Sequence, residues 1–151
     1  DFIWVHAAAT VLESTLAYNL NALDTPTLVV EMGVGMRLTR SYGDQLLNGL
    51  LSLMQSLGMW KGPVDPITDP LLGDDGNVSF LNASGPGIFV PCVGHAARVE
   101  KGQEVGIVAD PLTGEIRETL KSPVSGLLFT LREYPVVYEG SLLARILELQ
   151  A

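Results

Sequence analysis

The first part of the chain combines helical spacing of leucines with a short aliphatic run. From Thr10 to Leu23 the leucines recur every three or four residues, the spacing of an amphipathic helix. The segment Asp24-Thr25-Pro26 should stop that helix. The β-branched and aliphatic residues from Thr27 to Val30 then predict a buried β-strand. The order of helix, turn and strand indicates an α/β arrangement.

A second helix is predicted after Arg40, with Ser41 and Asp44 as candidate N-terminal caps. Its apolar positions share one broad face, formed by Leu46, Leu47, Leu50, Leu51, Met54 and Leu57. Gly58 should end the helix. We expect this apolar face to lie on the sheet that contains the strand Thr27 to Val30.

The pattern changes after a segment rich in Pro, Gly and Asp between Lys61 and Asp75, which predicts a linker. Short β-like runs follow, at Gly87–Pro91, Val105–Val108, Ile116–Leu120, Gly126–Leu131 and Leu142–Leu147. Similar turn sequences precede two of these runs and predict a pseudo-symmetric sandwich whose halves exchange strands. We therefore expect an α/β part at 1–62, a linker at 63–85 and an all-β domain at 86–151.

Composition limits the classes of function. The net charge is −8 with only nine Lys and Arg, which argues against a nucleic-acid partner. Charged residues interrupt every apolar region, so we expect no membrane partner. The single cysteine, Cys92, excludes an intramolecular disulfide, and no basic targeting segment is visible, so we expect a cytoplasmic protein. The mean hydropathy of +0.30 indicates a covered apolar surface, and we expect a homo-oligomer.

Glu31 is the first candidate for chemistry, because it stands at the end of the aliphatic run. Gly33 and Gly35 follow it and allow the backbone to approach a ligand closely. A carboxylate at the end of a buried strand is expected to pair, bind metal or transfer protons. The alternative is a glutamate that reaches solvent or caps the next helix.

Four segments share an order with one enzyme family: Thr25-Pro-Thr-Leu-Val-Val-Glu-Met-Gly, Gly87-Ile-Phe-Val-Pro, Val99-Glu-Lys-Gly-Gln-Glu-Val-Gly and Ser122-Pro-Val-Ser-Gly. Together with the helix that ends at Gly58, they resemble the succinylglutamate desuccinylase/aspartoacylase family, which belongs with the zinc carboxypeptidases. The resemblance spans about Thr10 to Ile146. It implies the C-terminal part of a zinc-carboxypeptidase-like α/β domain, followed by an all-β barrel-sandwich similar to lipoyl or biotinyl domains.

The resemblance also implies a reaction. Glu31 matches the family's general base and acid, which acts on a zinc-bound water to hydrolyse an amide or ester bond of a small N-acyl amino acid-like substrate. The family's zinc ligands are an upstream HxxE pair and a further His, and this sequence contains no HxxE, while His6 does not match the third ligand. We therefore expect the C-terminal portion of a zinc enzyme, with no metal in this chain and no activity alone. The alternative is a non-catalytic binding or oligomerisation module.

Two further residues are candidates for binding an acylated amine substrate. Arg37 follows the Glu31 loop, and its guanidinium suits a substrate carboxylate or an oxyanion, with Arg40 a weaker candidate. The alternative for both is a surface charge at a helix start. Tyr138 resembles a tyrosine that some aspartoacylases send from the β-domain into the active site, and the alternative is an aromatic that covers the β-domain.

The pair Cys92 and His95 could hold half of a zinc site, but the sequence offers no second pair to complete it. We expect both residues to be structural. Lys121 precedes the Ser122 bend and lacks the flanking methionines of a lipoyl-lysine motif, so we expect no carrier function.

Overall fold

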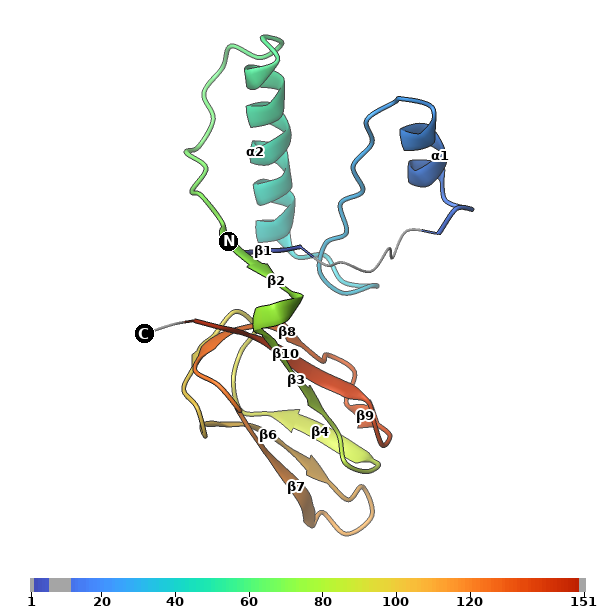
Figure 1. The fold of residues 1–151 in the computed structure, drawn as a ribbon, viewed down its shortest axis with the longest axis vertical. Helices are drawn as coiled ribbons and strands as arrows, with labels where there is room; N and C mark the ends of the chain where they lie inside the picture. The colour runs from blue at the N-terminus through green and yellow to red at the C-terminus, as the bar shows by residue number, and fades with distance from the viewer. Residues whose placement is uncertain (1, 6–11, 150–151) are drawn as a thin grey trace. The chain divides into compact units, whose positions relative to one another are not determined.

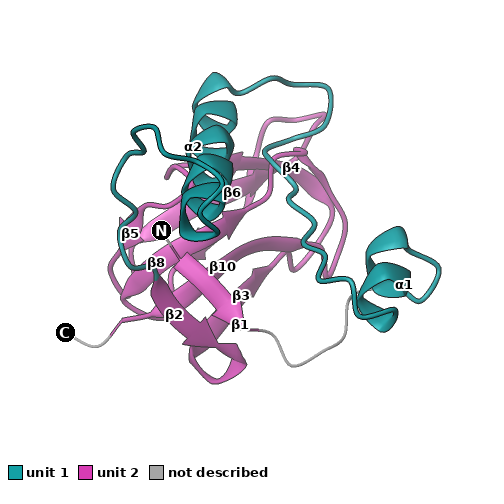
Figure 2. Cartoon of the chain, turned by 90° about the horizontal axis from the view of Figure 1, so that it is seen from above, with its two compact units in different colours: residues 1, 8–70 teal, residues 2–7, 71–151 magenta. Residues whose placement is uncertain are grey.

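The structure, a computed structural model, describes residues 2–5 and 12–149. The chain forms two compact units, of which unit 1 comprises residues 1 and 8–70 and unit 2 comprises residues 2–7 and 71–151 (Figure 2). The described residues are mostly β-sheet with few helices, and the helices α1 and α2 both belong to unit 1 (Figure 1). No helix in these residues combines the length and hydropathy of a membrane span.

Helix α1 (Leu16–Ala22) is shorter than the leucine spacing predicted. Thr15 is its N-cap: the Thr15 hydroxyl accepts a hydrogen bond from the Tyr18 N–H at 3.3 Å and donates one to the Leu12 carbonyl at 2.8 Å. A capped turn at Leu12 to Thr15 is therefore favoured over continued helix. The prediction of one helix through Leu12 was wrong, and Thr10 lies outside the described residues.

Helix α2 (Arg40–Ser56) begins earlier than predicted. Thr39 is its N-cap, and the Thr39 carbonyl accepts from the N–H groups of Tyr42 and Gly43 at 3.1 and 3.3 Å. Ser41 and Asp44 lie inside the helix, so their assignment as caps was wrong. Gly58 has φ +73° just beyond the helix, as the predicted stop requires.

The predicted buried strand from Thr27 to Val30 does not form. This segment is extended, but no strand pairs with it among residues 2–5 and 12–149. Leu28 is 87% exposed, and the side chains of Val29 and Val30 are also more than half exposed. An isolated extended segment cannot satisfy its backbone groups in a ladder, so it is not a strand in this chain.

The apolar face of α2 likewise lacks the sheet that we expected beneath it. Leu47, Leu50 and Leu57 of this face are each about half exposed or more. Another face of α2 is covered by the segment that returns after the helix (Figure 1). There the Asn48 side chain accepts from the Asp65 N–H at 2.8 Å and donates to the Asp65 carbonyl at 3.2 Å.

The described residues of unit 2 form two antiparallel sheets of four strands and a two-stranded ribbon. One sheet has the order β3 (Val78–Asn82), β10 (Leu142–Glu148), β8 (Gly126–Leu131), β5 (Arg98–Val99). The other has the order β7 (Ile116–Lys121), β6 (Glu104–Ala109), β4 (Gly87–Pro91), β9 (Val136–Val137). The ribbon pairs β1 (Phe2–Val5) in parallel with β2 (Leu71–Asp74), and a short 3₁₀ helix (Asp75–Asn77) connects β2 to β3.

The two halves of unit 2 are internally related. The strands β3, β4, β5 and β6 are equivalent to β7, β8, β9 and β10, so each sheet takes strands from both halves. The Gly102 N–H donates to the Ser122 carbonyl at 2.7 Å, and the equivalent Gly140 N–H donates to the Ala83 carbonyl at 2.8 Å. The exchange of strands between similar halves, which the turn sequences predicted, is therefore observed.

The buried core follows the same relation. Phe89, Val108 and Leu143 belong to one buried cluster, formed by Ala83, Phe89, Val108, Leu120, Val137 and Leu143. Their equivalents lie in the second cluster, formed by Val99, Val105, Leu128, Ala144 and Ile146. All fully buried apolar side chains of the described residues lie in unit 2. Unit 2 therefore has a core of its own, whereas the apolar residues of unit 1 stay largely exposed.

The expected linker at 63–85 includes strands β2 and β3, and the two units divide between residues 70 and 71. The domain ranges that we derived from composition stay a prediction.

Gly126 provides a test of this packing. A Cβ atom at Gly126 would lie 1.9 Å from the Leu147 carbonyl oxygen, which is backbone and cannot move aside. We expect Gly126→Ala to lower the free energy of unfolding by about 2–4 kcal/mol. Gly85→Ala is the matched control, because its Cβ would meet no atom within 4 Å. Urea unfolding of both variants measures the difference, and equal stabilities would contradict the observed packing.

Candidate active site

Glu31 lies in the extended segment that follows α1, and its side chain is exposed. The Asn21 side chain fixes the start of this segment, because it accepts from the Thr27 N–H at 2.9 Å and donates to the Thr27 carbonyl at 3.0 Å. Asp24 has φ +56° and turns the chain between the helix and the segment. Residues at the end of α1 thereby position the start of the segment that carries Glu31.

The loop after Glu31 is held against the first turn of α2. Gly33 has φ +64°, and a Cβ atom there would lie 3.2 Å from Cδ2 of Tyr42. This position therefore favours glycine on both conformational and steric grounds. Arg37 follows in a turn, where its N–H donates to the Val34 carbonyl at 3.3 Å. Glu31 and Arg37 thus belong to one exposed loop of unit 1.

The exposure of Glu31 changes the argument for its role. We expected a carboxylate at the end of a buried strand, and neither the strand nor the burial is present in the described residues. Desolvation therefore gives no reason to assign proton transfer to Glu31 within this chain. The catalytic role of Glu31 stays a prediction that rests on the family resemblance.

Tyr138 belongs to unit 2, whereas Glu31 and Arg37 belong to unit 1. It follows β9 and is 70% exposed, and its N–H donates to Oγ of Ser141 at 3.0 Å. It lines a shallow groove of about 370 Å³ within unit 2. The other lining residues are mostly apolar: Pro86, Gly87, Ile88, Asp110, Pro111, Leu112, Arg117, Val136 and Val137. The structure therefore offers Tyr138 an apolar neighbourhood, and its contact with substrate stays a prediction.

Asp110 and Arg117 form an ion pair in the wall of this groove, which the sequence analysis did not identify. Oδ1 of Asp110 accepts from the N–H of Leu112 at 2.7 Å and of Thr113 at 3.2 Å. Arg117 also donates to the Pro86 carbonyl at 2.6 Å. The Leu112 N–H, followed by the Thr113 N–H and the guanidinium, holds the pKa of Asp110 below its ordinary value. The sequence feature that could have located this ion pair is the turn formed by Asp110-Pro111 and Gly114 between two β-like runs.

Cys92 and His95 do not form a joint site. The Cys92 thiol donates to Oε1 of Glu104 at 3.4 Å, and His95 Nε2 lies 3.0 Å from the Phe129 carbonyl. The hydrogen bond to Glu104 raises the pKa of the Cys92 thiol, which disfavours the nucleophilic thiolate. Both residues therefore have structural partners.

No three His, Cys, Asp or Glu side chains come together as a possible metal site in the part of the chain that the structure describes. His6, the weak candidate ligand, lies outside that part. The described residues therefore do not fit a zinc ion by themselves, because a protein zinc site needs at least three ligands.

Comparison with known proteins gives structural relatives only. No protein-family model matches the chain. No curated protein matches it by sequence. Among solved structures, a succinylglutamate desuccinylase from Silicibacter sp. TM1040 is similar over 97% of this chain and 45% of its own, with 20% identity and a TM-score of 0.71.

Two other solved structures agree with this similarity. The apo ectoine utilization protein EutE (DoeB) from Ruegeria pomeroyi matches 89% of this chain and 43% of its own, at 18% identity and a TM-score of 0.68. A succinylglutamate desuccinylase/aspartoacylase from Rhodobacter sphaeroides matches 76% of this chain and 37% of its own, at 15% identity and a TM-score of 0.59. The chain spans less than half of each relative. The resemblance to the succinylglutamate desuccinylase/aspartoacylase family is thereby confirmed at the level of fold.

The pKa of Asp110 gives a test by pH. A carboxyl group whose pKa is lowered in the folded state stabilises the fold when the pH is above its pKa in the unfolded chain, about 3.9. That stabilisation is lost as the pH falls through the pKa that the carboxyl group has in the folded state. We therefore expect Asp110→Asn to lower the Tm at pH 7, with a difference from the native chain that shrinks below about pH 4.

Glu115→Gln, in the same hairpin, is the control and should leave the Tm unchanged at pH 7. Thermal unfolding from pH 2 to pH 7 measures both variants. A difference for Asp110→Asn that grows towards low pH would contradict the assigned bonds.

Proposed function

We propose that this chain is part of a hydrolase that cleaves an amide or ester bond of a small N-acyl amino acid-like substrate. One observation carries the proposal: 97% of the chain is similar in fold to a succinylglutamate desuccinylase. The order of the aliphatic run, Glu31 and Gly33 supports it, because this is the family's arrangement for its proton carrier.

Glu31 is proposed to move one proton twice. Its carboxylate takes a proton from the attacking water, while the water oxygen forms a bond to the substrate carbonyl carbon. The resulting carboxylic acid then protonates the leaving amine as the carbon–nitrogen bond breaks. The exposure of Glu31 in this chain leaves its carboxylate accessible to such a substrate.

The family implies zinc, which would polarise the carbonyl and acidify the attacking water. The described residues gather no three potential ligands, so we assign no metal ligand to them. We propose that any zinc ligands of the whole protein lie outside these residues, and that this chain supplies the proton carrier.

Arg37 and Tyr138 are proposed to bind substrate. The Arg37 guanidinium can hold a carboxylate of the acylated amino acid through two parallel hydrogen bonds. The Tyr138 phenol can donate a hydrogen bond from the rim of its groove. We also propose that unit 2 is a barrel-sandwich bordering the substrate entrance, and that the whole protein is cytoplasmic and homo-oligomeric.

Replacement of Glu31 tests the proposal. In the whole protein that contains this chain, we expect Glu31→Gln to lower kcat about 10²- to 10⁴-fold, because the amide cannot carry the proton. Glu13→Gln is the control, since Glu13 is also exposed in unit 1. Steady-state kinetics with a panel of N-acyl amino acids measures both. Unchanged kcat in Glu31→Gln would remove Glu31 from the mechanism, and no hydrolysis of any panel member by the native protein would favour a non-catalytic module.

A further inference from the structure

The loop from Glu31 to Leu38 is not held by its larger apolar side chains. Every residue of this loop except Val34 is exposed, and the side chains of Met36 and Leu38 are fully exposed. Apolar packing of these side chains therefore does not fix the loop. Because the Glu31 side chain is exposed as well, the direction of its carboxylate depends on the backbone that carries it.

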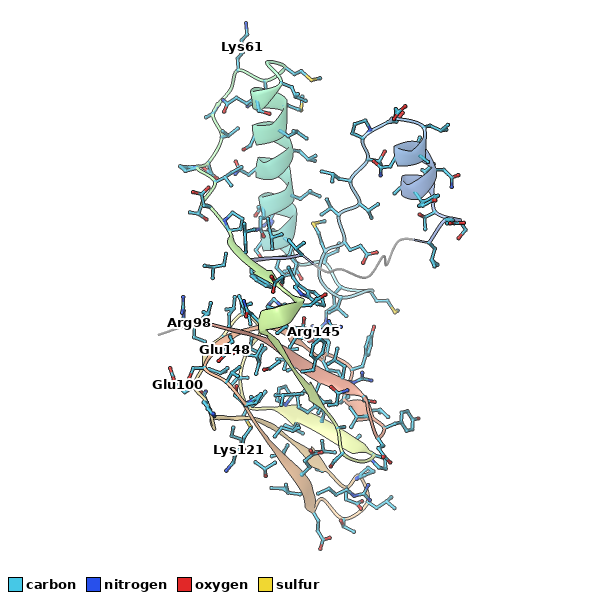
Figure 3. All side chains as sticks on the ribbon, in the orientation of Figure 1. Lys61, Arg98, Glu100, Lys121, Arg145 and Glu148 are labelled. Carbon is cyan, nitrogen blue, oxygen red and sulfur yellow. The ribbon has the colours of Figure 1, made fainter. Side chains whose placement is uncertain are left out.

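Charge from Lys61 does not orient the Glu31 carboxylate either. Lys61 is the charged side chain of unit 1 that Figure 3 labels, and it lies beyond the end of α2 that is remote from this loop. Helix α2 has 17 residues, and a rise of about 1.5 Å per residue separates its two ends by roughly 25 Å. This distance exceeds the range of a screened charge at physiological ionic strength, which is about 8 Å.

A ring contact joins the loop to α2. Tyr42 lies in the first turn of α2, where its N–H donates to the carbonyl of the N-cap Thr39 at 3.1 Å. Gly33 lies directly against the Tyr42 ring, because a Cβ atom at Gly33 would be 3.2 Å from Cδ2 and 3.3 Å from Cε2 of that ring. The helix therefore presents the ring as a support for the Gly33 backbone.

The backbone next to this contact is also well defined. Gly33 has φ +64°, which turns the chain at the point where it meets the ring. The Arg37 N–H donates to the Val34 carbonyl at 3.3 Å and closes the following turn. Glu31 lies two residues before Gly33, and two residues of extended chain span at most about 7 Å. A shift of Gly33 is therefore transmitted to Glu31.

We propose that Tyr42 is a positioning residue for Glu31. Its ring supports the Gly33 backbone, and this backbone sets the direction in which the Glu31 carboxylate points. The inference rests on the proposed function, in which Glu31 carries a proton from the attacking water to the leaving amine. Proton transfer requires heavy atoms about 2.6–3.2 Å apart, so a small displacement of the carboxylate lowers the rate strongly.

The ring of Tyr42, and not its hydroxyl, provides the support. Both atoms nearest to the Gly33 position, Cδ2 and Cε2, are ring carbons. Phenylalanine keeps these carbons, whereas alanine removes them. The proposal therefore requires that Tyr42→Phe preserves the position of Glu31 and that Tyr42→Ala does not.

Kinetics of the whole protein that contains this chain test the role, with the panel of N-acyl amino acids as substrates. Tyr42→Ala should lower kcat at least about tenfold, because the proton carrier is displaced. Tyr42→Phe should retain the native kcat. Tyr18→Ala is the matched control and should also retain it, since Tyr18 of α1 is 39% exposed and Tyr42 is 38% exposed.

A combined variant separates positioning from a general loss of structure. In a protein that already carries Glu31→Gln, no proton carrier remains to be displaced, so adding Tyr42→Ala should change kcat by less than about twofold. A further fall as large as in the native background would show damage that does not act through Glu31, and would overturn the proposal. An equal fall of kcat in Tyr18→Ala would overturn it too.

The kinetic outcomes also distinguish this role from the proposed function. Loss of kcat in Glu31→Gln, together with full kcat in Tyr42→Ala, would remove Tyr42 and leave the proposed function intact. Unchanged kcat in Glu31→Gln, or no hydrolysis by the native protein, would remove the proposed function and the positioning role with it.

NMR spectroscopy of this chain measures the contact without any substrate. The Tyr42 ring should displace the Hα resonances of Gly33, and the displacement should disappear in Tyr42→Ala and persist in Tyr42→Phe. Gly35 is the internal control, because a Cβ atom there would meet no atom within 4 Å. Gly33 resonances that are the same in the native chain and in Tyr42→Ala would overturn the proposal.

Discussion

The crossed backbone hydrogen bonds between turns and bends are the constraint on which unit 2 depends. In each half, a turn with glycine at positive φ donates to the bend between the first and second strands of the other half, through Gly102 to Ser122 and through Gly140 to Ala83. These bonds oblige each sheet to combine strands from both halves. The two related core clusters follow from that arrangement.

Local signals in the sequence were sufficient to predict many of the strands of unit 2. The runs at β4 and β8 are bounded by glycine and proline and rich in aliphatic residues, and both formed as strands. The strands β5 and β9 were not predicted, because each has only two residues and is defined by its neighbours rather than by a pattern. The helix α2 was predicted but its cap was not, since several polar residues near Arg40 could serve equally well by type.

The site was less predictable than the fold. An aliphatic run such as Thr27 to Val30 favours a buried strand, but it does not show which other strands would pair with it and cover it. Among the described residues, no strand pairs with this run, and its side chains are exposed. Glu31 was identified from its place after the aliphatic run and from the family resemblance, and after the loss of the expected burial only the resemblance supports its role. The ion pair of Asp110 and Arg117 joins a hairpin turn to the strand that follows it, and single-sequence patterns do not report such side-chain pairing. These gaps share one cause, which is that contacts between distant segments leave no local signature.

Unit 2 holds the buried core, whereas the Glu31 segment has no paired strand among residues 2–5 and 12–149. Native-state hydrogen exchange on the purified chain tests this most directly, because protection reports local stability residue by residue. We expect the slowest exchange in β8 and β10, around Leu128 and Ile146, and little protection from Leu28 to Met32. Protection of Leu28 to Met32 equal to that of β8 would contradict it, since the segment would then be a paired and buried strand.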